Sequence, residues 1–121
     1  MTQTISFDEA VFRELDAELG TEDTAEILKS FLEDTERKLV RLEADDQPRP
    51  VIKREAHSMK SSAATFGFNQ LSKLARELEA SAEFMPKAAL QESIHGLRQT
   101  FEATRKFARD SLLDIKSGVT P

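Results

Sequence analysis

Residues 56–67 read AHSMKSSAATFG, and this segment combines a histidine, a lysine and a run of small residues. Because an α-helix advances by about 100° per residue, side chains three and four positions apart share one face. One such face carries His57, Lys60, Ser61 and Ala64. A second, apolar face beside it consists of Ile52, Ala56, Met59, Ala63 and Phe66. The segment therefore predicts a packed helix that has a solvent-facing histidine with a cation one turn away.

Helical periodicity extends over most of the chain. Apolar residues recur at steps of three and four, no segment shows the strict alternation of a β-strand, and glycine and proline, four of each, fall mostly at the joints and chain end. We expect helices over residues 8–19, 22–45, 49–66, 69–84 and 87–115. Residues 1–121 then form a single all-α domain, an antiparallel up-and-down four-helix bundle with an additional short N-terminal helix across one end.

Residue types at the joints indicate how the helices begin and end. Ser6 and Glu9 match the capping box, in which a serine is followed three residues later by a glutamate. Thr21 is a candidate N-cap for the second helix. Gly67 is a candidate left-handed cap for the third helix, and Pro86 suits the first turn of the fifth.

The composition argues against several classes of function. A net charge of −5 argues against nucleic acid as a partner, and two histidines with no cysteine argue against a metal site. The chain has no phosphate-cradling loop motif, so we expect no nucleotide and no cofactor of its own. No apolar run approaches the roughly 18 residues of a membrane span, and the N-terminus lacks the pattern of a signal peptide. We therefore expect a cytoplasmic protein without membrane insertion.

An exposed imidazole with a nearby cation and small neighbours is the environment that a phosphorylated histidine requires. Neutral imidazole is nucleophilic near neutral pH, so His57 is the candidate phospho-acceptor. The alternative is a surface histidine on a structural helix. His95 provides a contrast, because Arg98 and Gln99 occupy the positions where His57 has a lysine and a small residue. We interpret His95 as an ordinary helix residue.

The stretch from Ala56 to Glu79 resembles the histidine-containing phosphotransfer (HPt) domain of multistep two-component signalling. The motif of that family is a histidine, lysine at plus three, glycine at plus four, two small residues and glycine at plus ten. The corresponding residues here are His57, Lys60, Ser61, Ser62, Ala63 and Gly67, and a leucine-rich continuation follows through Leu71, Leu74, Leu78 and Glu79. Ser61 departs from the usual glycine and adds a hydroxymethyl group where a partner would approach.

The resemblance implies a phosphoryl carrier without kinase activity of its own. The ring nitrogen of His57 farther from the backbone would carry the group, and the other nitrogen would donate a hydrogen bond. Glu79, on the next helix, is the candidate acceptor of that bond, and a solvated carboxylate is the alternative for this residue. Lys60 would provide electrostatic support for the charge on the transferred group.

The resemblance also implies the partners. Donor and acceptor would be aspartates of response-regulator receiver domains, of a hybrid sensor kinase and of a downstream regulator, and the receiver would bring the Mg²⁺. The carrier would be a monomer.

Clearance for the receiver would come from Ser61, Ala64 and Gly67, whose alternative role is close helix packing. Positive potential near the site would come from Lys53, Arg54, Lys73 and Arg76, whose alternative role is that of charges on solvated helix faces. An apolar patch, either docking surface or core, would be formed by Val11, Phe12 and Leu15.

Three other functions stay open at this point. A non-catalytic helical adaptor would have the bundle but accept no phosphoryl group. The phosphotransfer domain of a chemotaxis-type kinase also uses a histidine with a lysine at plus three, but it takes its phosphoryl group from an ATP-bound catalytic domain. A metal-binding bundle would show metal-dependent melting, and its ligands have no plausible spacing here.

Overall fold

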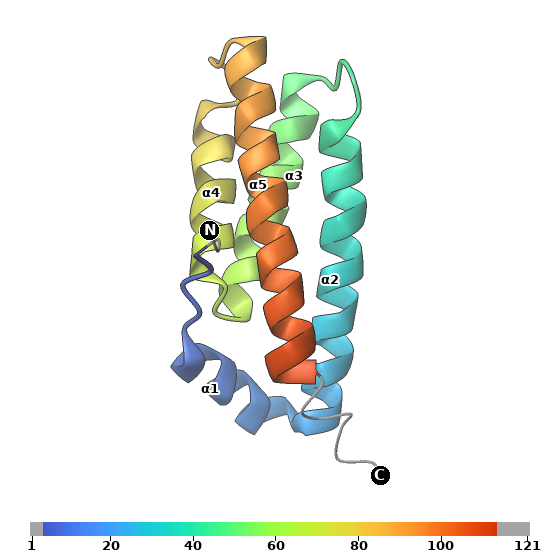
Figure 1. Ribbon diagram of the computed structural model, residues 1–121, viewed down its shortest axis with the longest axis vertical. Coiled ribbons are helices and arrows are strands. Elements are labelled where there is room, and N and C mark those ends of the chain that lie inside the picture. Colours follow the sequence, from blue (N-terminus) through green and yellow to red (C-terminus); the bar gives the residue numbers. More distant parts are fainter. Residues whose placement is uncertain (1–3, 114–121) are drawn as a thin grey trace.

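The chain folds into an up-and-down bundle of four long helices, and a short helix lies across one end (Figure 1). The computed structural model describes residues 4–113. The helices are α1 Glu9–Leu19, α2 Thr21–Glu43, α3 Arg49–Thr65, α4 Asn69–Ser81 and α5 Lys87–Phe107, and α5 continues as a π-helical segment, Ala108–Leu113. The predicted all-α bundle with an extra N-terminal helix is confirmed.

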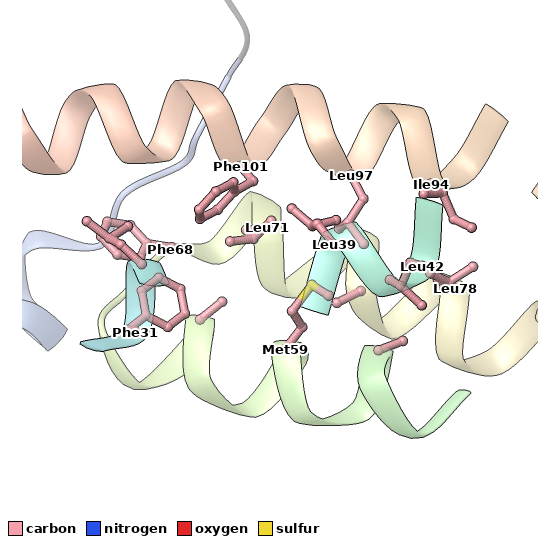
Figure 2. Packing of buried hydrophobic residues seen from close by; sticks show 14 of the residues in the cluster. Phe31, Leu39, Leu42, Met59, Phe68, Leu71, Leu78, Ile94, Leu97 and Phe101 are labelled. Carbon is pink, nitrogen blue, oxygen red and sulfur yellow. The ribbon is translucent and has the colours of Figure 1, made fainter. Parts of the chain in front are cut away.

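The apolar stripes of the sequence meet in one core between the four long helices. On α3 the predicted inward residues Ile52, Ala56, Met59, Ala63 and Phe66 are all buried. Facing them are leucines of α2 and α4 and the apolar residues Ile94, Leu97 and Phe101 of α5 (Figure 2). Burial of these side chains is the main force that holds the helices together.

At one end of the core, aromatic rings join the N-terminal segment to the bundle. The ring of Phe7 lies 4.8 Å from that of Phe107 and 5.7 Å from that of Phe68, measured between centroids. Backbone hydrogen bonds run beside these rings, from the Asp8 amide to the Gly67 carbonyl at 2.8 Å and from the Asn69 amide to the Ser6 carbonyl at 3.3 Å. The segment before α1 is therefore tied to the turn between α3 and α4.

Two predicted helix starts are wrong in detail. The N-cap of α1 is Asp8, whose carboxylate accepts a hydrogen bond from the Val11 amide at 3.3 Å, whereas Ser6 lies outside the helix with φ +49°. Gly20, with φ +89°, precedes α2, so Thr21 is already helical and does not cap it. The start of α1 is thus set by the Asp8 cap two residues after the predicted one, and the start of α2 by the backbone conformation of Gly20 without a side-chain cap.

The predicted end of α3 is confirmed. Gly67 has φ +84°, and its amide donates to the Ala64 carbonyl at 3.1 Å. The Phe68 amide donates to the Ala63 carbonyl at 3.0 Å, which completes the pair of bonds known as the Schellman motif. These bonds satisfy carbonyls that a helix terminus leaves without partners.

The helices α2 and α4 end earlier in the chain than predicted. α2 ends at Glu43 rather than residue 45, because Ala44 is extended and Asp46 has φ +59°. α4 ends at Ser81 rather than residue 84, and the Arg49 guanidinium donates to the Ala82 carbonyl and, at 2.7 Å, to the Met85 carbonyl. The predicted end of the last helix, residue 115, lies outside the described residues.

An ion-pair network on the side formed by α2 and α5 links these two helices. The Arg98 guanidinium donates to Glu36 at 2.7 Å and to Glu43 at 2.8 Å, and it also contacts Glu102 on its own helix. The hydrogen bonds that Arg98 donates to these carboxylates, first that to Glu43, raise the pKa of Arg98, and the bond from Arg98 lowers the pKa of Glu36. Charge-assisted bonds of this kind favour one register between two helices.

Acidification should weaken this α2–α5 link. The pKa of Glu36 is lower in the folded chain than its ordinary value of 4.5, so its ionised form stabilises the fold above that value. This contribution disappears as the pH falls through the lower folded-state pKa. We expect the melting temperature to fall between about pH 5 and pH 3, and to fall less in Glu36→Gln, as measured by circular dichroism. Equal losses in both proteins would contradict the assignment.

Candidate functional site

His57 lies on the outer side of α3, at the seam with α4. Its side chain is 61% exposed, although its neighbours Ala56 and Met59 are fully buried. The apolar face of α3 is held in the core, so this opposite part of the helix must point to solvent. The structure therefore places an accessible imidazole on a rigid helix, as the pattern of the segment predicts.

A carboxylate on α4 orients the imidazole. Nδ1 of His57 lies 2.6 Å from Oε2 of Glu79. An ionised carboxylate has only acceptor atoms, so Nδ1 carries the proton and donates it to this bond. In the neutral ring the lone pair is then left on Nε2, the nitrogen that can act as a nucleophile.

The same carboxylate also binds Lys60. Nζ of Lys60 lies 2.8 Å from Oε1 of Glu79, so the two oxygens of one carboxylate hold the imidazole and the ammonium. The side chains of Lys60 and Glu79 are 30% and 21% exposed. The hydrogen bonds from Lys60 and then from His57 lower the pKa of Glu79 below its ordinary value, so this carboxylate is ionised at neutral pH.

Further polar contacts fix α3 against α4 on both sides of His57. The Ser72 hydroxyl donates to the backbone carbonyl of Lys60 at 2.9 Å, and Nζ of Lys53 lies 3.0 Å from the Glu83 carboxylate. Sequence reasoning did not identify Ser72 or Glu83 as part of this seam. Their spacing contained part of the signal, because Ser72 and Glu79 are seven positions apart and share one face of α4, and Glu83 follows four positions after Glu79, just beyond the end of the helix.

The residues expected to face a partner beside His57 differ in their exposure. Ser61 and Ala64, one and two turns further along α3, are exposed, as is Arg54 one turn before the histidine. Gly67 is not an access gap, and this part of the expectation is corrected. It is buried, and a Cβ atom built on it would lie 2.5 Å from the Asp8 carbonyl oxygen, so its small size accommodates the N-terminal segment.

The remaining candidate residues fall into different environments. Phe12 is buried in the core, whereas Val11 and Leu15 are half-buried. Lys53 is paired with Glu83, and Lys73 and Arg76 are exposed on α4. His95 is exposed on α5 and borders a hollow beside the α2–α3 connection.

The part of the chain that the structure describes holds neither a metal-binding cluster nor a helix suited to a membrane. Between residues 4 and 113, no three or more histidine, aspartate or glutamate side chains gather in a way that could hold a metal ion. Within the same range, no helix has both the length and the apolar character required to cross a membrane.

The fold is an up-and-down helical bundle, and its site is an exposed histidine that a carboxylate orients and that has a lysine one turn away. These features together define the class of helical bundles that present a reactive histidine on their surface. The family model of the Hpt domain matches residues 26–107, and the chain belongs to this family. Hpt domains are phosphocarrier modules of two-component signalling, and they interact with response-regulator receiver domains. Comparisons with curated proteins and with solved structures found no significant match.

Proposed function

We propose that Nε2 of His57 carries a phosphoryl group between the aspartates of two receiver domains. The observation that carries this proposal is the bond from Nδ1 to Glu79 in a side chain that is 61% exposed. This bond leaves the lone pair on the accessible nitrogen, and membership of the Hpt family supplies the chemistry. The donor would belong to a hybrid sensor kinase and the acceptor to a downstream regulator, with the carrier acting as a cytoplasmic monomer.

In the first transfer, the Nε2 lone pair attacks the phosphorus of a receiver phospho-aspartate. The P–Nε2 bond forms while the P–O bond breaks, and the electron pair of the broken bond leaves with the aspartate carboxylate. Nδ1 keeps its proton, so the ring becomes a phosphoimidazolium and no proton has to leave Nε2. Glu79 stabilises the positive charge that develops on the ring, as an oriented carboxylate does beside a catalytic imidazole. The second transfer is the reverse reaction with another aspartate.

The carrier supplies only part of the transition-state stabilisation. Negative charge spreads over the three equatorial phosphoryl oxygens, and we propose that Lys60, whose ammonium shares the Glu79 carboxylate with His57, supports it. We propose that the receiver provides Mg²⁺, and that Ser61 and Ala64 allow its surface to approach. Arg54 would then meet the acidic rim of the receiver pocket.

Transfer from a panel of ³²P-labelled receiver domains tests this proposal. The expected product is an acid-labile, base-stable label on this chain, which returns to a second receiver when one is added. Labelling by an ATP-bound histidine kinase catalytic domain, but by no receiver, would identify a chemotaxis-type phosphotransfer domain instead. An adaptor would accept label from neither source.

Lys60→Ala should slow transfer in both directions by about 10-fold, because one cation near the transferred group is lost while Mg²⁺ on the receiver remains. The fold should stay intact, since Lys60 is part of a surface ion pair. Rapid-quench kinetics would measure the rate constants. Lys53→Ala is the matched control, because Lys53 is also paired with a carboxylate beside α4 but is not bound to Glu79. Equal effects of the two substitutions would remove Lys60 from the mechanism.

A further inference from the structure

Lys60, the cation of this chain that supports the phosphoryl group in the proposed mechanism, is already paired with Glu79. In the unphosphorylated protein, Nζ of Lys60 is 2.8 Å from Oε1 of Glu79, while Oε2 of the same group is 2.6 Å from His57. The ammonium therefore has a carboxylate partner before any phosphoryl group arrives. Because Lys60 is one turn from His57, the carboxylate and a phosphoryl group on Nε2 would compete for it.

We propose that Glu79 limits how strongly His57 retains its phosphoryl group, because Lys60 must give up its pair with Glu79 to bind the phosphoryl oxygens. This inference rests on the proposed phosphorylation of His57. The ion pair stabilises the unphosphorylated state only. Its free energy therefore makes the phosphorylated state less favourable relative to the unphosphorylated one. A carrier benefits from this arrangement, since a phosphohistidine that is too stable would not pass its group on.

The size of the effect follows from the exposure of the pair. Lys60 and Glu79 are 30% and 21% exposed, so their pair should resemble surface ion pairs more than buried ones. Such pairs change an equilibrium constant by about two- to five-fold. The competition for Lys60 should therefore lower the ratio of phosphorylated to unphosphorylated His57 by about this factor.

The substitution Glu79→Gln is suited to the test because glutamine keeps an oxygen that can accept the Nδ1 proton. It removes the charge that binds Lys60 and leaves an acceptor for the ring. Glu79→Gln also weakens the support of the imidazolium, an effect that does not depend on Lys60. A double-mutant cycle with Lys60→Met separates the two effects, because only the competition for the ammonium requires a lysine at position 60.

The experiment uses four proteins in a His95→Gln background: unchanged, Glu79→Gln, Lys60→Met and the double variant. Each is equilibrated with fixed concentrations of phosphoramidate and ammonia, and ³¹P NMR measures the fraction of phosphohistidine. The phosphoramidate P–N bond breaks, ammonia leaves, and the P–Nε2 bond forms. We expect Glu79→Gln to raise the phosphorylated-to-free ratio about two- to five-fold more when Lys60 is present than when methionine replaces it.

Equal effects of Glu79→Gln in the two backgrounds would overturn the inference. Because no receiver domain is present, this result is distinct from failure of the proposed function. If the proposed function fails, phosphoramidate will phosphorylate His57 but no labelled receiver domain will transfer its phosphoryl group to it. A His57 that phosphoramidate also leaves unmodified would overturn both.

Discussion

His57→Gln is expected to abolish phosphoryl transfer to this chain. Glutamine has no nucleophilic ring nitrogen, so no covalent intermediate can form, and neither Lys60 nor Glu79 can replace it. The label accepted from a phosphorylated receiver should fall from about one group per chain to background. Because His57 is exposed on the surface of the bundle, the fold should be unchanged, which circular dichroism and thermal melting would verify. Radiolabel counting after gel separation measures the transfer.

The matched control is His95→Gln. His95 is also an exposed helical histidine, but it lies on α5 and has Arg98 and Gln99 at the positions where His57 has Lys60 and Ser61. This variant should accept label as the unchanged protein does. Label that persists in His57→Gln and disappears in His95→Gln would move the phosphorylation site to α5.

Gly67→Ala is expected to lower the free energy of unfolding by about 2–4 kcal/mol. Two causes act together at this residue. Its φ of +84° is a conformation that residues with a Cβ rarely adopt, and the added Cβ would lie 2.5 Å from the Asp8 carbonyl oxygen. The clash is with backbone, so a side-chain rotation cannot relieve it. The chain would have to move residues 6–8 away from the α3–α4 turn and lose the hydrogen bond from Asp8 to Gly67.

Two other glycines separate the causes of this effect. Gly20 has φ +89° but a Cβ atom added there would have nothing within 4 Å, so Gly20→Ala should show backbone strain without the clash. Gly96 is inside α5 with open space around it, and Gly96→Ala should stabilise the fold by about 0.5–1 kcal/mol. Urea denaturation of the three variants measures the differences. A Gly67→Ala protein as stable as the unchanged chain would show that the N-terminal segment is not held as the structure has it.

The helices and the identity of the central histidine could be predicted from the sequence because both depend on local spacing. Steps of three and four residues place Ala56, Met59 and Ala63 on one side of α3 and His57 and Lys60 on another, whatever the neighbouring helix is. The cap at Gly67 is equally local, because the hydrogen bonds that define it join residues at most five positions apart.

Only the tertiary structure decided which residues of other helices and segments these side chains contact. The sequence leaves open whether Glu79 faces His57 or solvent, since this depends on how α4 is rotated and shifted against α3, and packing of the buried leucines sets that register. The same holds for Gly67, whose cap is visible in the sequence but whose contact with Asp8 joins residues nearly 60 positions apart. Periodicity within a helix thus determined which residues are exposed. Contacts between helices determined that one carboxylate binds both the histidine and its lysine.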